Sequence, residues 1–224
     1  MSAPNSPTIP YPTLCLVTDR SYSQGQPLST KVAAAVEGGV NLVHLREKDL
    51  PSGQLLALAT AIRDVTREKA LFLVNDRVDV ALAAGADGVQ LGEEALPVEA
   101  VRRIARQRLL IGRSVHSLQG AREAEDQGAD FLLVGTIFPT GSKPETQTAG
   151  LQLLALVARS VNVPFLAIGG VNSSNVAQVI AQGAAGAAVI SAILAPPDTQ
   201  QAARELKEAM VAATASPRMA SSIG

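Results

Sequence analysis

Eight short apolar segments alternate with longer segments of helical periodicity along this chain, and no other feature of the sequence constrains its fold as strongly. Parallel strands that helices cover are apolar almost throughout, and these segments fit that description. The expected strands are Leu14–Thr18, Leu42–Arg46, Leu71–Asn75, Gly88–Leu91, Leu110–Ser114, Phe131–Gly135, Phe165–Gly169 and Ala187–Ser191. Eight β-then-α units in about 200 residues predict an α/β protein, a single-domain (β/α)8 TIM barrel, with an open doubly wound sheet as the alternative.

The segments between the strands carry the spacing of amphipathic helices. Apolar residues recur at intervals of three and four, which places them on one helical face. The clearest stripes are Leu55, Leu58, Ala59 and Ile62; Val98, Val101, Ile104 and Ala105; and Ala202, Leu206, Ala209 and Met210. A weak internal repeat also places a glycine shortly before several strands, where we expect it to end a helix in the left-handed conformation. These glycines are Gly85, Gly128, Gly183 and, in a looser copy, Gly39.

The composition agrees with one soluble domain that has a sizeable core. The chain has 224 residues, of which 47% are hydrophobic, and α/β barrels of this size are routinely single domains. A net charge of −1 gives no electrostatic reason to expect nucleic acid or an anionic membrane as a partner. No apolar run reaches the ~18 residues that a membrane helix needs. Cys15 is the only cysteine, which excludes an intramolecular disulfide and favours a cytoplasmic location.

The two ends of the chain differ from its middle. Residues 1–12 contain four prolines, no basic residue and no apolar run, which predicts a flexible tail and not a signal peptide. Residues 213–224 are expected to form a second flexible tail, so that the barrel domain covers residues 13–212. The sequence leaves open whether the protein is a homo-oligomer.

Several of the expected strands end in polar residues, at the end of a barrel that carries the active site. Residues two apart on a strand point the same way, so His44 and Arg46 are expected to share a face, with Lys48 just beyond. Asn75 and Asp76 end the third strand, where a helix cap explains them as well as a metal site does. Further polar candidates at strand ends are Ser114, Thr140, Ser142 and Lys143.

A phosphate site is expected after the last two strands. Gly169 and Gly170 follow the seventh strand, and Ile190 and Ser191 end the eighth. In this fold the loops at these places, together with a helix N-terminus, form the usual phosphate site. Two glycines let the backbone approach a ligand closely, although such a pair is often only a turn. The cations expected nearby are Arg46, Lys48, Lys143 and, as a further candidate, Arg113, so a small phosphorylated substrate is expected.

His116 is the first candidate for proton chemistry. It follows the fifth strand and is one of only two histidines in the chain. A histidine side chain can both give and take a proton near neutrality. His116 and His44 each have a purely structural alternative, as packed histidines of the barrel.

With these motifs in place, the sequence resembles the thiamine phosphate synthase/TenI family over about residues 13–195. The matching segments are Leu16–Asp19, Leu45–Lys48, Val74–Arg77, Ala86–Val89, Gly135–Thr140 and Ala167–Gly170. The resemblance implies a (β/α)8 barrel and a role in thiamine biosynthesis. Thiamine phosphate synthases join hydroxymethylpyrimidine diphosphate to a thiazole phosphate, with Mg2+ held by two aspartates. TenI-like thiazole tautomerases aromatise a thiazole carboxylate phosphate without a metal.

The synthase branch matches this sequence at most, but not all, of its motif positions. The resemblance implies Asp76 as the first metal aspartate and diphosphate binding by Arg46, Lys48, Asn75 and Lys143. Two positions depart from it: Ala95 stands where the second aspartate belongs, and His44 stands where a glutamine precedes the Arg-Glu-Lys run. Glu93 or Glu94 could supply the missing carboxylate, but from a shifted position, and Mg2+ demands near-octahedral geometry.

The tautomerase branch resembles three short segments more closely, His44–Glu47, Val89–Leu91 and Ile111–Ser117, and the combined departures at His44 and Ala95 favour it over the synthase branch. We therefore expect an isomerase, a thiazole tautomerase, with His116 as acid/base, no cofactor and a small phosphorylated thiazole as substrate. The substrate-binding residues that the resemblance implies are His44, Arg46, Lys48, Asn75, Ser114, Thr140, Ser142, Lys143, Gly169, Gly170, Ile190 and Ser191. The alternatives are a synthase with Mg2+ at Asp76 and a non-catalytic protein that binds thiazole phosphate.

Overall fold

The computed structural model describes residues 8–140 and 148–215, which form a closed barrel of eight parallel strands in sequential order. The predicted (β/α)8 barrel is confirmed. The open-sheet alternative is wrong, because β1 pairs with β8, with Thr13 opposite Gly186. The strands are β1 Thr13–Val17, β2 Leu42–Leu45, β3 Leu71–Asn75, β4 Gly88–Leu91, β5 Leu110–Val115, β6 Phe131–Gly135, β7 Phe165–Ile168 and β8 Gly186–Val189.

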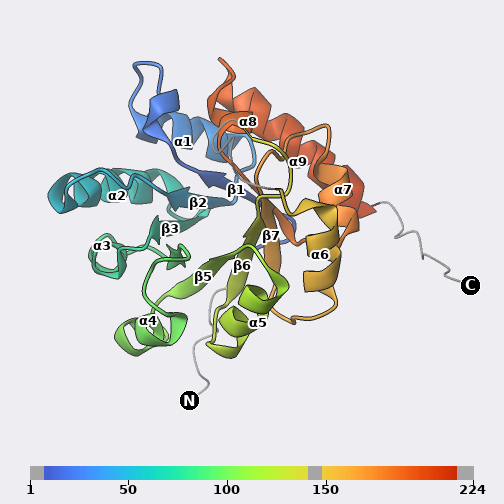
Figure 1. Cartoon of the computed structure of the whole chain (residues 1–224). Coiled ribbons are helices and arrows are strands. Elements are labelled where there is room, and N and C mark those ends of the chain that lie inside the picture. Colours follow the sequence, from blue (N-terminus) through green and yellow to red (C-terminus); the bar gives the residue numbers. More distant parts are fainter. Residues whose placement is uncertain (1–7, 141–147, 216–224) are drawn as a thin grey trace, which may run out of the picture.

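Helices surround the barrel on its outside (Figure 1). They are α1 Leu28–Glu37, α2 Ser52–Thr66, α3 Val78–Ala83, α4 Val98–Ala105, α5 Leu118–Asp126, α6 Gly150–Ala158, α7 Val176–Ala181, α8 Ser191–Leu194 and α9 Thr199–Ala215, with a 3-10 helix at Arg20–Tyr22. The helix α9 runs three residues into the expected C-terminal tail. One member of the expected stripes, Ile104, is 50% exposed and does not pack in the core. Within the described ranges, none of the helices has the length and apolar character needed to cross a membrane.

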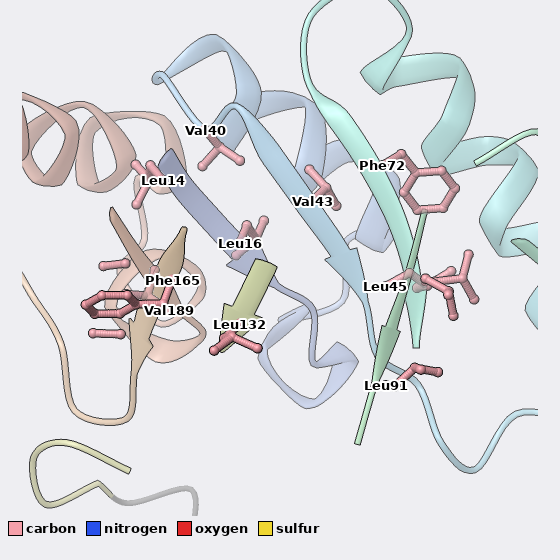
Figure 2. Close-up of a cluster of buried hydrophobic side chains, with 14 of the residues drawn as sticks. Leu14, Leu16, Val40, Val43, Leu45, Phe72, Leu91, Leu132, Phe165 and Val189 are labelled. Atoms are coloured by element: carbon pink, nitrogen blue, oxygen red, sulfur yellow. The ribbon is translucent and has the colours of Figure 1, made fainter. Parts of the chain in front are cut away.

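Side chains of each strand alternate between the barrel interior and the layer under the helices. On β1, Cys15 and Val17 belong to the interior cluster, whereas Leu14 and Leu16 belong to the outer one. Figure 2 shows part of the outer cluster, including Leu16 and Phe72, beside the ribbon of neighbouring strands and helices. Full burial of a Leu or Phe side chain stabilises the fold by about 1.5–3 kcal/mol. These two clusters therefore account for why nearly continuous apolar runs form the strands.

The internal repeat belongs to the end of the barrel opposite the active site. Its glycines have the expected positive φ angles: Gly39 110°, Gly85 63°, Gly128 87° and Gly183 94°. In two copies the aspartate that follows pairs with a helix arginine, Asp87 with Arg63 and Asp130 with Arg102, at 2.7 Å each. Both aspartates also accept a backbone N–H of the preceding strand. The repeat therefore stabilises the barrel, as residues at this face generally do.

Candidate active site

A cavity of about 750 Å³ lies at the carboxyl ends of the strands, within the size range of small-molecule sites. Two of the predicted site residues, Ser142 and Lys143, lie outside the described residues. The cavity brings the other predicted residues together: His44, Arg46, Lys48, Asn75, Asp76, Ser114, His116, Thr140, Gly169, Gly170, Ile190 and Ser191.

The barrel interior changes from apolar to polar toward this cavity. Leu42 and Leu73 belong to the interior cluster, and because side chains alternate along a strand, His44 and Asn75 face the same way two residues later. On β5, Ser114 takes a hydrogen bond of 3.1 Å from the Gln90 Nε2 atom of β4. His44, Asn75 and Ser114 therefore form the floor of the cavity, and Gln90 lies buried beside Ser114.

His44 is held in this floor as a neutral ring. Its side chain is buried, with 3% of the residue exposed, and its Nε2 atom lies 3.1 Å from Asn75 Oδ1. Burial lowers the pKa of His44 from 6.5 to about 3; the bond to Asn75 opposes this shift, and the positive charges of Arg46 and Lys48 add to it. The Nδ1 atom has no hydrogen-bond partner in the part of the chain that the structure describes.

The Asp76 carboxylate is fixed from two sides. Its Oδ1 atom accepts the backbone N–H of Gly92 at 2.8 Å, and its Oδ2 atom accepts the Asn75 amide at 2.8 Å. The backbone of Asp76 has a φ of 56°, and its N–H donates to the Gln90 carbonyl. An ionised carboxylate has about four acceptor positions, so these two bonds leave oxygen lone pairs for a cation in the cavity.

The surroundings of Asp76 decide how a magnesium ion could be held. Ala95 lines the cavity at the position expected for the second aspartate. Of the two glutamates before it, Glu93 faces His116, and Glu94 is exposed at the cavity. Among residues 8–140 and 148–215, no three His, Cys, Asp or Glu side chains group to hold a metal ion. Mg2+ is commonly bound by one or two carboxylates together with substrate phosphates, and Asp76 fits the one-carboxylate case.

His116 is oriented by two neighbours. Its Nδ1 atom lies against the Gly135 carbonyl oxygen, which only accepts hydrogen bonds, so Nδ1 carries a proton. Its Nε2 atom lies 3.6 Å from the Glu93 carboxylate. With side chains that are 38% and 59% exposed, the pair remains open to solvent at the cavity. His116 therefore presents Nε2 at the wall of the cavity.

Arg113 does not supply the further cation that we expected. It precedes Ser114 on β5, and because Ser114 faces the interior, Arg113 faces outward. Its guanidinium donates to the backbone carbonyls of Glu93, at 2.9 Å, and Leu96, at 3.3 Å. Arg113 therefore positions the loop between β4 and α4, and it does not line the cavity.

The glycine pair after β7 is required by the packing of the neighbouring loop. Gly169 and Gly170 have φ angles of 98° and 65°. A Cβ atom on Gly169 would lie 2.4 Å from Thr136 Cγ2, and one on Gly170 would lie 2.5 Å from the Pro139 carbonyl oxygen. The loop after β6 therefore packs against this pair, which brings Thr140 to the cavity.

The sequence analysis missed two contributions from the first turn. Asp19 and Tyr22, at the 3-10 helix after β1, also line the cavity. Asp19 belongs to a matching segment but was not predicted as a site residue, and Tyr22 belongs to no motif. Glu47 is buried, and its carboxylate accepts the Thr18 hydroxyl at 2.8 Å. Burial raises the pKa of Glu47, while the Thr18 bond opposes this shift. The alternation in Arg46-Glu47-Lys48 could have indicated that Glu47 faces away from the two cations.

Comparisons with known proteins agree on one family. A family model described as thiamine monophosphate synthase matches residues 14–193. The thiamine-phosphate synthase of Roseiflexus sp. (strain RS-1) is 42% identical over 214 residues, 93% of this chain and 91% of that protein. That of Methanoculleus marisnigri is 45% identical, over 92% and 98% of the two chains. The solved thiamine phosphate pyrophosphorylase from Pyrococcus furiosus has a TM-score of 0.84 and 42% identity, over 90% of this chain and 96% of its own.

These relatives overturn the expected isomerase. Proteins that are more than 40% identical over nearly the whole chain are named synthases, which are transferases, so the expectation of a thiazole tautomerase is wrong. The closer relation to the TenI-like branch is not confirmed. It depended on the departures at His44 and Ala95 and on the segments Val89–Leu91 and Ile111–Ser117. In the structure, Arg113 of the last segment lies outside the cavity.

The residues that match the family model are the same ones that form the barrel and its cavity. The family model begins one residue after the start of β1 and ends inside α8, so it spans all eight strands of the barrel and the loops that line the cavity. From this coverage it follows that the protein belongs to the thiamine monophosphate synthase family.

Proposed function

We propose that this protein is a thiamine-phosphate synthase, a transferase that joins hydroxymethylpyrimidine diphosphate to a thiazole phosphate and releases diphosphate. The observation that carries the proposal is that two separate sets of residues suited to anions line one cavity together with the Asp76 carboxylate. One set, with Arg46 and Lys48, follows β2, and the other, with Gly170 and Ser191, follows β7 and β8. A condensation of two phosphorylated substrates would occupy both sets. The Asp76 carboxylate in the same cavity is what a diphosphate bound with Mg2+ requires, whereas a single thiazole carboxylate phosphate has no need of it.

Arg46 and Lys48 are proposed to bind the diphosphate, with Lys143 as a further cation. The Arg46 backbone N–H donates to Thr18 Oγ1 at 3.0 Å, and that hydroxyl donates to Glu47. Charge-assisted bonds to phosphate are about twice as strong as neutral ones, so these cations favour departure of the diphosphate. Asp76 is the residue proposed to hold Mg2+, and when bound the ion supplies Lewis-acid neutralisation of the leaving group.

The thiazole phosphate is proposed to lie at the other set. Its ligands would be the backbone around Gly169 and Gly170 and the start of α8 at Ile190 and Ser191, where unpaired N–H groups of a first helical turn attract phosphate. Thr140 lines the cavity beside them, and Ser142 is proposed to join it. His44, Asn75 and Ser114 form the polar floor beneath the substrates. This arrangement orients the two reactants. In a two-substrate reaction, holding the reactants in the right geometry removes a large part of the activation barrier.

The coupling needs no acid or base at the atoms that react. The bond from the methylene carbon to the diphosphate oxygen breaks, and a bond from that carbon to the thiazole ring nitrogen forms. The ring nitrogen attacks with a lone pair and carries no proton. His116, which lines the cavity, is therefore proposed to take no part in proton transfer. Replacing it in His116→Gln should lower kcat by less than about tenfold, against the 10²–10⁴-fold that loss of an acid/base produces.

A coupling assay tests the proposed function. Protein would be mixed with the pyrimidine diphosphate, the thiazole phosphate and Mg2+, and thiamine phosphate would be measured by chromatography. We expect product that disappears with a chelator and falls at least about 10²-fold in Asp76→Asn, because one preorganised charge contributes on this scale. The matched control is Asp64→Asn, the same change at an exposed position on α2. Absence of product from folded wild-type protein would end the synthase proposal.

A further inference from the structure

A chain of hydrogen bonds runs from the buried floor of the barrel to the carboxylate that we propose as the metal ligand. His44 Nε2 lies 3.1 Å from Asn75 Oδ1, Asn75 Nδ2 lies 2.8 Å from Asp76 Oδ2, and Asp76 Oδ1 lies 2.8 Å from the Gly92 nitrogen. His44 stands where the resemblance to the synthase branch expected a glutamine, so these contacts begin at a departure from that branch's pattern.

The direction of every bond in this chain follows from the carboxylate. A carboxylate that binds a metal is ionised and only accepts hydrogen bonds. Asn75 must therefore turn its NH2 group toward Asp76, which leaves its carbonyl oxygen toward His44. His44 must then donate from Nε2. In a neutral ring the proton can sit on only one nitrogen, so Nδ1 keeps a lone pair.

The surroundings of His44 agree with this assignment. The residue is only 3% exposed, and burial favours the neutral ring, so its role as a donor at Nε2 does not change over the physiological pH range. The remaining nitrogen, Nδ1, has no partner among the described residues, as expected for a lone pair that faces no donor. A buried polar atom without a partner needs an explanation. The explanation here is that the ring is oriented by the bond that its other nitrogen, Nε2, makes to Asn75.

We propose that His44 is a positioning residue: its Nε2–H fixes the Asn75 amide, and the amide in turn fixes the Asp76 carboxylate for a divalent cation. The inference rests on the proposed function. Without the histidine donor the Asn75 amide loses one of the two bonds that fix its orientation, so the amide holds the Asp76 carboxylate less firmly. Partners behind a metal ligand generally matter in this way, and their loss weakens metal binding by about 10–100-fold.

The test measures cation binding without turnover. Mn2+ would be titrated into the protein in the presence of inorganic diphosphate, and free Mn2+ would be followed by its electron paramagnetic resonance signal. We expect His44→Leu to weaken Mn2+ binding about 10–100-fold, and His44→Gln, whose amide can donate to Asn75, to stay within about threefold of wild type. The control is Gln90→Leu, which removes another buried polar side chain that bonds Ser114 and not Asn75.

The outcomes are distinct. Unchanged binding in His44→Leu, or equal weakening in His44→Leu and His44→Gln, would overturn the proposal, because the donor would then be irrelevant. Unchanged binding in Asp76→Asn would instead show that the metal ligand of the proposed function is wrong. If His44→Leu does not fold, the ring 15N shifts of the wild-type protein decide. The chain has two histidines, His116→Gln assigns them, and a proton on Nδ1 of His44 would overturn the proposal.

Discussion

His44 ties the stability of this protein to pH, because its ring is buried in the barrel without a counter-charge. In the folded state its pKa is about 3, against 6.5 for an exposed histidine. The unfolded chain therefore takes up a proton below pH 6.5 that the folded chain excludes. This contribution to stability is complete above pH 6.5 and is lost as pH falls toward 3, by about 1.4 kcal/mol per pH unit.

A comparison of wild type with His44→Gln isolates this effect. Urea unfolding at pH 7 and pH 5 would give the free energy of unfolding of both proteins. Between these pH values we expect the wild type to lose roughly 2 kcal/mol more than the variant, which has no group that titrates at this position. Other carboxylates, such as the buried Glu47, contribute to both proteins and cancel in the difference. An equal loss in the two proteins would contradict the prediction.

At the scale of elements, the loop between β4 and α4 is held in part by a side chain of the neighbouring strand β5. Arg113 on β5 donates to two of its carbonyls, those of Glu93 and Leu96, and this loop carries the glutamate that faces His116. Arg113 therefore holds a loop that forms part of the cavity wall, and it does so from outside the barrel interior.

Replacing this arginine should loosen the loop while the barrel stays folded. We expect Arg113→Met to lower the free energy of unfolding by about 1 kcal/mol. It should also speed amide hydrogen exchange at Ala95, whose N–H donates to the Gly92 carbonyl, by about tenfold or more. The control is Arg103→Met, the same change at an exposed position on α4. Exchange at the Ala95 amide that is as slow as in wild type would show that the loop is held by other contacts.

At the scale of the whole molecule, closure of the barrel depends on a close approach of the first and last strands. Gly186 opens β8 opposite Thr13 of β1, and a Cβ atom there would lie 1.9 Å from the Thr13 carbonyl oxygen. Neighbouring backbone cannot give way easily, because it belongs to the ladder that closes the sheet.

We expect Gly186→Ala to destabilise the protein by roughly 3 kcal/mol, at the upper end of overpacking effects, as measured by urea unfolding. The same substitution in open space is the control: Gly53 lies in α2 with no atom within 4 Å of the added Cβ, and Gly53→Ala should be neutral or stabilise by up to about 1 kcal/mol. Similar stabilities of the two variants would refute the role of Gly186 in closure.

The fold could be predicted from the sequence because its pattern is local and repeated. Each strand is a short apolar run, and each helix carries a stripe, so errors stayed at the boundaries: β8, expected from Ala187, begins at Gly186, and α9 continues to Ala215. The polar residues at strand ends also pointed to one cavity, since parallel strands in a barrel place all their carboxyl ends on one side. Whether those residues bind substrate stays a prediction.

Other features were decided by the tertiary structure, because they depend on which side chains meet across strands. Arg113 had the residue type of a site cation, but its position next to the inward-facing Ser114 turns it to the outside. His44 is an ordinary histidine in sequence, and only its burial and its contact with Asn75 make it a neutral donor. The expected isomerase depended on a few short segments and on the departures at His44 and Ala95, whereas relatives that match nearly the whole chain are named synthases. The sequence alone determined the barrel and the end that carries its cavity, and three-dimensional packing decided what each residue at that end can do.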